Sequence, residues 1–179
     1  MSDAITADIR YGYMTLSVCM IVKNEERVLG RCLACAAQIA DELIVVDTGS
    51  TDRSAEIARQ YTPHVYLHQW QDSFAEARNY SYSLATCDYI MWLDADDVID
   101  EENLSKFNDL KKRCLADVDV IFTIYNMFTE DGITNYTLRD RIIRRSLDAK
   151  WEYDIHEGIP MQPEWKYLYR TDITIQHKK

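Results

Sequence analysis

The sequence predicts an α/β fold in which a mostly parallel central sheet is flanked by helices and followed by an antiparallel C-terminal portion. Three near-continuous apolar runs, at residues 15–22, 42–47 and 88–94, lead to this prediction. Runs without polar alternation are typical of strands covered on both faces, as in parallel sheets. Helical patterns separate the runs, and this alternation indicates βαβ connections.

The first half of the chain supplies most of the predicted parallel sheet. After the strand at 15–22, apolar residues recur at helical spacing from Val28 to Ile39. The strand at 42–47 is followed by Gly49, which permits a tight turn. One of the three polar residues after Gly49 can cap a helix that reaches Tyr61. A short strand at 64–68 and a helix at 74–85 follow, and they lead into the strand at 88–94.

The second half predicts one further helix and the antiparallel strands. Residues 103–114 read as a helix, and residues 118–128 are rich in β-branched and aromatic side chains. The Asp131–Gly132 pair predicts a turn from which residues 134–143 return as a hairpin. Two short terminal strands are expected at 165–169 and 173–177.

Length and composition indicate one domain. With 179 residues and 47% hydrophobic content, the chain can bury one sizeable core, which we assign to residues 15–179. Residues 1–14 show no period and are expected to be a disordered leader. The net charge of −10 argues against non-specific binding of nucleic acid.

Compartment is predicted from two absences in the sequence. No apolar run approaches about 20 residues and no signal peptide opens the chain. The five cysteines are irregularly spaced, as in a reducing compartment, so the expected location is cytoplasmic. Cys32 and Cys35 form a C-x-x-C pair in an apolar helical segment, which favours a structural role over metal or redox chemistry. Peripheral contact with a membrane and oligomerisation both stay open.

The most informative stretch is the apolar run that ends in a predicted turn with the carboxylates Asp94, Asp96 and Asp97. In extended geometry Asp94 and Asp96 would leave on the same face, about 7 Å apart, and could bracket one divalent ion. The competing interpretation is that these acids favour the start of the next helix. Val98 and Ile99 stand where an EF-hand loop needs an oxygen ligand and a glycine, so such a calcium loop is not expected.

Three apolar strands end in polar residues: Lys23–Glu25, Asp47 and Asp94–Asp96. In open α/β sheets ligands bind beyond the carboxyl ends of the strands, so these groups are expected to share one crevice. Acids alone repel a phosphate. A nucleoside diphosphate would therefore need a divalent cation here, helped by Arg78.

The motifs SVCMIVKNEE (17–26), IVVDTGSTD (44–52) and WLDADD (92–97), in this order, resemble the signature of family-2 glycosyltransferases of the GT-A fold. FAEARN (74–79) and WEYDIHEG (151–158) are similar to a bacterial subgroup that modifies lipopolysaccharide cores or polypeptides. The resemblance covers about residues 15–177. Helical repeats that some relatives carry are absent, and the domain would be truncated relative to many of them.

The resemblance implies a donor site for a nucleoside diphosphate sugar, with a UDP-sugar as the first choice. Asp47 would contact the base or ribose, and Val22, Asn24 and Glu25 would line the same pocket. Arg78 would approach the diphosphate.

A divalent metal, Mg²⁺ or Mn²⁺, is also implied. Asp96 would bind the ion directly, Asp94 would hold the ribose or a metal-bound water, and His156 would complete the metal shell. His177 is the weaker candidate for that place.

The chemistry implied is inverting transfer of the sugar to an acceptor hydroxyl, the acceptor being a glycan, a lipid-linked molecule or a polypeptide. Glu157 would be the catalytic base, with Asp154 as second choice. The sequence departs from the family at Thr48, where many relatives carry a second aspartate. It also lacks an evident counterpart of the Glu-Asp pair that marks the base in other members.

Two other interpretations stay open at this point. A domain that binds a nucleotide sugar or a metal without turnover would serve a larger assembly, and a nucleotidyltransferase would need a glycine-rich phosphate loop, of which only Gly49 is present. The basic cluster Arg139, Arg141, Arg144 and Arg145 could receive an anionic acceptor or a lipid headgroup. A solvated strand face is the simpler interpretation of this cluster.

Overall fold

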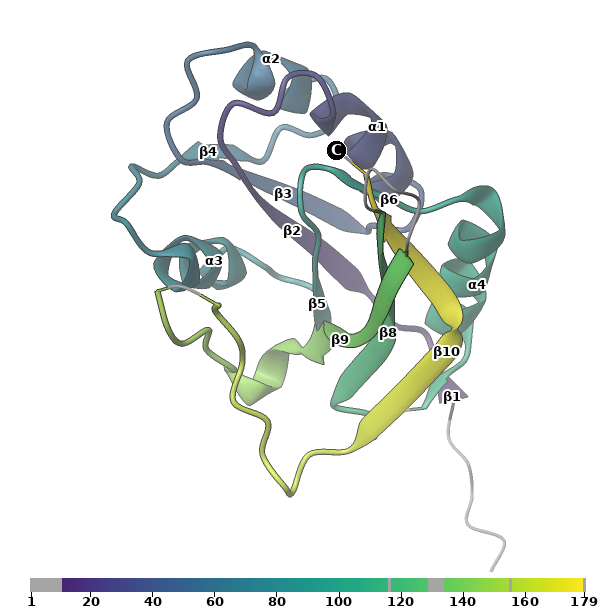
Figure 1. The fold of residues 1–179 in the computed structure, drawn as a ribbon. Helices are drawn as coiled ribbons and strands as arrows, with labels where there is room; N and C mark the ends of the chain where they lie inside the picture. Colours follow the sequence, from purple (N-terminus) through teal and green to yellow (C-terminus); the bar gives the residue numbers. More distant parts are fainter. Residues whose placement is uncertain (1–10, 116, 129–133, 155, 179) are drawn as a thin grey trace, which may run out of the picture.

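The computed structural model describes residues 11–115, 117–128, 134–154 and 156–178 (Figure 1). An eight-stranded sheet crosses this part of the chain, in the order β4-β3-β2-β5-β9-β8-β10-β6. Its strands are β2 (Leu16–Val22), β3 (Glu42–Asp47), β4 (Val65–Leu67), β5 (Tyr89–Trp92), β6 (Asp97–Val98), β8 (Val120–Phe128), β9 (Thr134–Arg144) and β10 (Tyr167–His177). A separate two-stranded sheet pairs β1 (Tyr11–Gly12) with β7 (Cys114–Leu115).

The helices cover both faces of the large sheet. They are α1 (Leu29–Ala36), α2 (Ser54–Ala58), α3 (Phe74–Ser83) and α4 (Glu101–Lys112), with a 3₁₀ turn at Arg145–Leu147. Side chains of α1, α2 and α4 belong to one buried cluster and those of α3 to another. Successive residues of β2 alternate between the two clusters, so the continuous apolar runs are explained by burial on both sides.

The predicted topology is confirmed. β4, β3, β2 and β5 run parallel to one another, and β9 returns antiparallel to both β5 and β8. The region 165–177 differs from its prediction. It forms one strand, β10, with a shift of register between Arg170 and Thr174, where two short strands were expected. β10 runs parallel to β8 and pairs His177 with Asp97 of β6.

The predicted leader is too long at its C-terminal end. Met14 is 1% exposed, and its backbone N–H donates to the Lys111 carbonyl oxygen at 2.8 Å, because the chain enters the core before β2 begins. Residues 1–10 and the predicted turn at residues 131–132 lie outside the described part. None of the described helices combines the length and apolar character needed to cross a membrane.

One predicted helix boundary moves because of capping, and another lies earlier than expected. Asp100 caps α4 by accepting from the Asn103 backbone N–H at 2.9 Å, so the helix begins at Glu101. α2 ends at Ala58, short of the expected Tyr61. Cys32 is buried in the core and its thiol contacts the Asp94 carbonyl oxygen at 3.2 Å, as its structural interpretation predicts.

Candidate functional site

The carboxyl ends of β2, β3 and β5 lie at one edge of the sheet, and a cavity of about 310 Å³ opens there. Val22 pairs with Asp47 in register, so the loops that follow β2 and β3 begin side by side. The cavity is lined by Ile21, Val22, Lys23, Glu25, Thr48, Trp70, Phe74, Arg78, Asp94, Ala95 and Asp96. We call it the donor cavity, after the donor site that the sequence predicts at this edge. The predicted convergence of the three polar strand ends is therefore observed.

Asn24 fastens the loop after β2 to the loop after β3. Its backbone adopts the left-handed conformation (φ 58°), and its side-chain oxygen accepts from the Thr51 N–H at 2.8 Å. The next amide, of Glu25, donates to Ser54 Oγ at 2.8 Å. These bonds fix the backbone from Val22 to Glu25, which borders the donor cavity. Asn24 itself lines a neighbouring hollow that Glu25 shares.

The Asp47 carboxylate accepts hydrogen bonds from the turn that follows it. It is 5% exposed, and its Oδ1 accepts from the backbone N–H groups of Gly49 and Ser50, at 2.8 and 2.7 Å. Thr48 borders the donor cavity, whereas Asp47 is not among the described residues that line it. The carboxylate therefore shapes the loop at the cavity wall, and its predicted contact with a ligand stays a prediction.

Arg78 of α3 joins two carboxylates that are distant in sequence. Its Nη2 donates to Asp94 Oδ1 at 2.8 Å and its Nε to Glu157 Oε1 at 3.0 Å. The guanidinium lies against both the Trp92 and the Trp151 ring, 4.8 and 4.9 Å from their centroids. Burial alone would lower the pKa of Arg78, but the two carboxylates raise it, so the group is a permanent cation.

Asp94 borders the donor cavity with a side chain that is 30% exposed. Burial raises its pKa, yet the cations Arg78 and Arg141 outweigh burial and hold the pKa below its usual value. Asp94 lies in a turn closed by a hydrogen bond from the Asp97 N–H to its carbonyl oxygen, at 3.0 Å. The turn that the sequence indicates here is therefore present, and Asp94 and Asp96 do not lie in the extended geometry in which their side chains would share one face.

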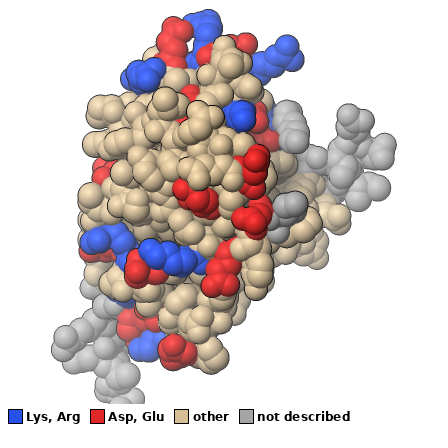
Figure 2. Space-filling model, turned by 90° about the vertical axis from the view of Figure 1, so that its left-hand side faces the viewer, with Lys and Arg blue, Asp and Glu red and all other residues tan. Residues whose placement is uncertain are grey.

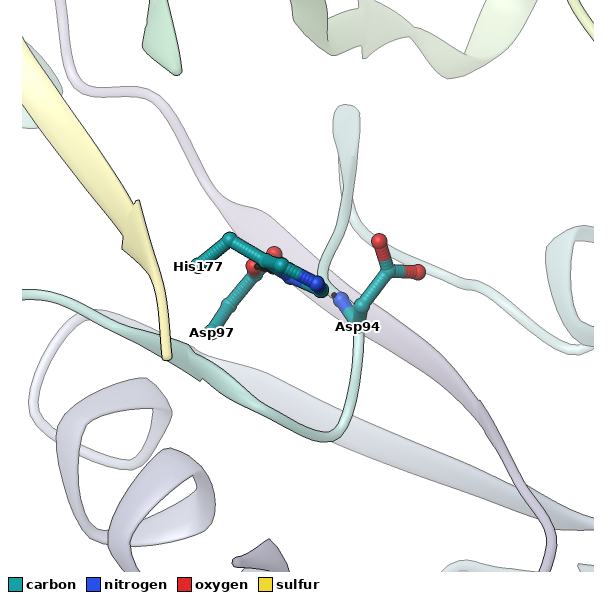
Figure 3. Close-up of side chains that lie close together, drawn as sticks. All are labelled: Asp94, Asp97 and His177. Atoms are coloured by element: carbon teal, nitrogen blue, oxygen red, sulfur yellow. Dashed lines mark hydrogen bonds and ion pairs between the residues drawn. The ribbon is translucent and has the colours of Figure 1, made fainter. Parts of the chain in front are cut away.

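His177 arrives at this turn from the end of β10. Its Nδ1 lies 3.1 Å from Asp96 Oδ1 and 3.4 Å from Asp97 Oδ1. Hydrogen bonds to these two acids raise its pKa to about 10. One potential ligand atom each of Asp94, Asp97 and His177 lies within 4.8 Å of the others. In Figure 3 the imidazole lies beside the Asp97 carboxylate, and the Asp94 carboxylate points away from both.

Asp97 is held by a buried polar network. Its side chain and that of Arg141 are both 0% exposed, and Arg141 Nη1 donates to Asp97 Oδ2 at 3.1 Å. Tyr125 Oη donates to Asp97 Oδ1 at 3.0 Å and lies 2.7 Å from His177 Nδ1. The Arg141 guanidinium stacks between Trp92 and Tyr125, at 3.7 and 4.2 Å from the ring centroids. Sequence reasoning missed this network. The one sign of it in the sequence was Arg141, an arginine directly before the apolar residues Ile142 and Ile143.

The described residues at this turn fit a divalent cation. Aspartate oxygens are the ligands that Mg²⁺ prefers, and one imidazole nitrogen is common for Mn²⁺. Asp97 is fully buried and accepts from Arg141, Tyr125 and the Asp94 N–H. The side chains of Asp94, Asp96 and His177 are 30, 10 and 25% exposed, so these three are the ones accessible to an ion. His177, and not His156, is the histidine that the structure brings to this turn.

The predicted base and its neighbours lie on the other side of Arg78. Glu157 and His156 line a second hollow of about 370 Å³ together with Phe74 and Arg139. Glu157 is partly buried, with a side chain 17% exposed. His156 and Asp154 are exposed, and Asp154 lines neither the donor cavity nor this second hollow. The structure brings Glu157 to the site and leaves Asp154 outside it.

The side of the molecule that carries α3 has an uneven distribution of charge. Figure 2 shows acidic side chains gathered near the middle of this face, with basic ones above and below them. An acidic centre repels an incoming diphosphate unless a cation is bound.

Comparison with known proteins gives a consistent picture. A model of the family described as "Glycosyl transferase family 2" matches residues 17–168. A TPR repeat-containing protein of Synechococcus elongatus is 32% identical over 170 residues, which cover 90% of this chain and 41% of that protein. The prophage-derived glycosyltransferase SunS of Bacillus subtilis is 33% identical over 146 residues, which cover 80% and 34%. The chain thus spans less than half the length of these relatives.

Solved structures share the fold at lower identity. TarS of S. aureus, residues 1–349 in complex with UDP-GlcNAc, has a TM-score of 0.69 at 19% identity, over 93% of this chain and 59% of that chain. Glucosyl-3-phosphoglycerate synthase of Mycobacterium tuberculosis, in complex with Mn²⁺ and UDP-Glc, has a TM-score of 0.52 at 20% identity, over 63% and 44%.

Proposed function

The chain belongs to glycosyltransferase family 2 and has the GT-A fold, and on this premise we propose that it transfers a sugar from a nucleoside diphosphate sugar to an acceptor hydroxyl, with inversion. One observation carries the proposal. Arg78 joins Asp94, at the donor cavity, to Glu157, at the second hollow. Glu157, a carboxylate that can accept a proton, is thus connected through Arg78 to Asp94, the group that would meet the donor.

A UDP-sugar and a divalent metal are the proposed donor and cofactor. Fold neighbours that were crystallised with UDP-GlcNAc, or with Mn²⁺ and UDP-Glc, support this choice. Asp94, Asp96 and His177 would hold Mg²⁺ or Mn²⁺. The ion would supply electrostatic stabilisation of the negative charge that develops on the departing diphosphate.

The remaining roles fall to groups at the two cavities. Backbone from Val22 to Glu25, with Thr48, would bind the nucleoside, and Asp47 keeps the adjoining turn in place. Glu157 would take the proton of the acceptor hydroxyl as its oxygen attacks the anomeric carbon. Arg78 is committed to two carboxylates, so we assign it to orienting Glu157 and Asp94, in place of direct contact with the diphosphate. The acceptor is a hydroxyl of a glycan, a lipid-linked molecule or a polypeptide. The protein itself would act in the cytoplasm.

The test begins with binding. Isothermal titration with a panel of nucleoside diphosphates, with Mn²⁺ and then with a chelator, should give metal-dependent binding of UDP that Asp96→Ala removes. Asp109→Asn, a change of an exposed acid on α4, is the matched control and should bind as the wild type does.

Turnover separates an enzyme from a binding domain. Glu157→Gln should bind UDP with wild-type affinity but release no UDP from UDP-glucose or UDP-GlcNAc when acceptors are added. If the wild-type protein binds the donor yet transfers to none of a broad set of acceptors, the domain binds without turnover and the proposed activity is wrong.

A further inference from the structure

The second hollow adjoins the donor cavity. Its lining residues are Phe74, Arg139, His156 and Glu157, and Phe74 also lines the donor cavity. Arg78, bonded to Glu157, is a second connection between the two spaces. A molecule in the hollow would therefore have the Glu157 carboxylate on one side and the donor cavity on the other. We call this space the acceptor hollow.

Two of the four residues that line the acceptor hollow are basic. Both Arg139 and His156 are exposed, in a chain whose formal net charge is −10. The Arg139 guanidinium lies 5.7 Å from the Trp92 ring centroid and interacts electrostatically with the neighbouring Asp140 carboxyl group. No described carboxylate forms an ion pair with it. Its charge is thus available to a ligand.

The neighbouring cation, Arg78, is not available to a ligand in the same way. Arg78 is 6% exposed, and its donors are taken by Asp94 and Glu157. An anionic group that enters beside Glu157 would be repelled by that carboxylate unless a second positive charge compensated it. Arg139 supplies such a charge, and a guanidinium offers two parallel N–H donors that match a carboxylate or a phosphate.

Phe74 supplies the apolar part of the same surface. Its side chain is 45% exposed and lies at the junction of the two cavities, with its ring edge against Trp70 at a centroid distance of 4.9 Å. An aromatic face beside a cation fits a molecule that combines a carbon framework with a charged substituent.

We propose that the acceptor hollow binds an acceptor that carries an anionic group, a phosphate or a carboxylate, with Arg139 and His156 binding that group. This inference rests on the proposed function and names the chemical class of its acceptor. The bound hydroxyl loses its proton to Glu157 while its oxygen forms a bond to the anomeric carbon. The bond from that carbon to the diphosphate oxygen breaks, and its electron pair leaves with the nucleoside diphosphate.

The experiment compares three molecules that differ only at C6: glucose, glucuronate and glucose 6-phosphate. ¹⁵N-labelled full-length protein is saturated with UDP and Mg²⁺, so that the donor cavity is filled, and each molecule is titrated while the amide signals are followed by NMR. The two anions should shift the signals of Arg139, His156 and Glu157 saturably, with an affinity about tenfold higher than that of glucose, the equivalent of one charge-assisted hydrogen bond. Whether the hollow prefers a phosphate or a carboxylate is decided by which of glucose 6-phosphate and glucuronate binds more tightly.

Two variants make the result specific. Arg139→Gln should reduce the affinity for both anions to that for glucose, whereas Arg31→Gln, the same change at an exposed position of α1, should leave it unchanged. Equal affinities for the three molecules, or no saturable shift in the hollow with any of them, would overturn the proposal. UDP binding is read separately, from Lys23 and Thr48, so a defective donor site is distinguished from an acceptor hollow that does not select anions.

Discussion

The Nε of Arg78 donates to Glu157 Oε1 at 3.0 Å, across 79 residues of sequence. The same guanidinium binds Asp94, so its orientation is set by both cavities. A lysine keeps the charge but cannot form two directed bonds of this geometry.

We therefore predict that Arg78→Lys lowers kcat by about 100-fold, the contribution of a well-placed general base. The affinity for UDP should change only a few-fold. Steady-state kinetics with UDP-glucose or UDP-GlcNAc, together with titration of UDP, measure the two effects. Arg53→Lys, at an exposed pair with Glu56, is the control. A variant with unchanged kcat would show that Arg78 does not position the base.

The choice between His177 and His156 as metal ligand gives a second prediction. Losing a group that merely supports a metal ligand costs about 10- to 100-fold in metal affinity, and losing the ligand itself should cost at least as much. His177→Gln should thus weaken Mn²⁺-dependent binding of UDP by that factor. His156→Gln should leave the metal affinity unchanged, because His156 lies in the acceptor hollow. Calorimetry at several Mn²⁺ concentrations distinguishes them, and the opposite pattern would restore His156 as the ligand.

The buried pair Asp97–Arg141 gives a prediction about stability. Both side chains are fully buried and 3.1 Å apart. Removing one partner leaves a buried charge without compensation, so Arg141→Met should lower the free energy of unfolding by about 3–5 kcal/mol. The double variant Arg141→Met/Asp97→Asn should recover part of this loss. Urea denaturation of the three proteins provides the measurement, and a single variant within about 1 kcal/mol of wild type would contradict it.

The sheet could be predicted because burial on both faces leaves a simple record in the sequence. The strand at 42–47 was predicted with its observed bounds, since all its residues after Glu42 are buried. The same rule located Asp47 and Asp94 at the edge where the donor cavity opens. The turn at Asp94–Asp97 is closed locally, by the Asp97 N–H on the Asp94 carbonyl oxygen. The partners of its side chains, which are Arg78, Arg141 and His177, come from other elements and were not predictable from this stretch.

Long-range partners account for the remaining errors. Asp97 and His177 meet across 80 residues because β10 pairs with both β8 and β6. Nothing near His177 in sequence signals this pairing, whereas His156 stands beside a plausible base. Arg141 was grouped with exposed arginines by spacing. Only the positions of the Trp92 and Tyr125 rings show that it is buried.

The N-terminal boundary of the fold can be tested at Met14. Its side chain is 1% exposed and belongs to the main hydrophobic cluster. Met14→Ala should lower the free energy of unfolding by about 2–4 kcal/mol, the usual cost of truncating a buried methionine. Tyr13→Ala, at a residue that is 61% exposed, should cost much less. Chemical denaturation compares the two, and equal small effects would mean that the domain begins after residue 14.

The ion pair between Asp41 and Lys111 gives a prediction about pH. Lys111 Nζ lies 2.7 Å from Asp41 Oδ2, and the Leu16 N–H donates to the same oxygen at 2.8 Å. Burial raises the pKa of Asp41, but the hydrogen bonds from Lys111 and Leu16 outweigh it and hold the pKa below the ordinary value of 3.8.

A carboxyl group whose pKa is lower in the folded state stabilises the fold while it is ionised in both states. The contribution of Asp41 should therefore be complete at pH values above 3.8 and should be lost as the pH falls below that value, through the pKa of the folded state. The difference in unfolding free energy between the wild type and Asp41→Asn should accordingly be constant near neutral pH and shrink in acid. Urea denaturation at a series of pH values measures it, with Asp109→Asn, a change at an exposed acid of α4, as the control. A difference that grows as the pH falls would show that Asp41 stabilises the fold in its protonated form and that its bond to Lys111 contributes little.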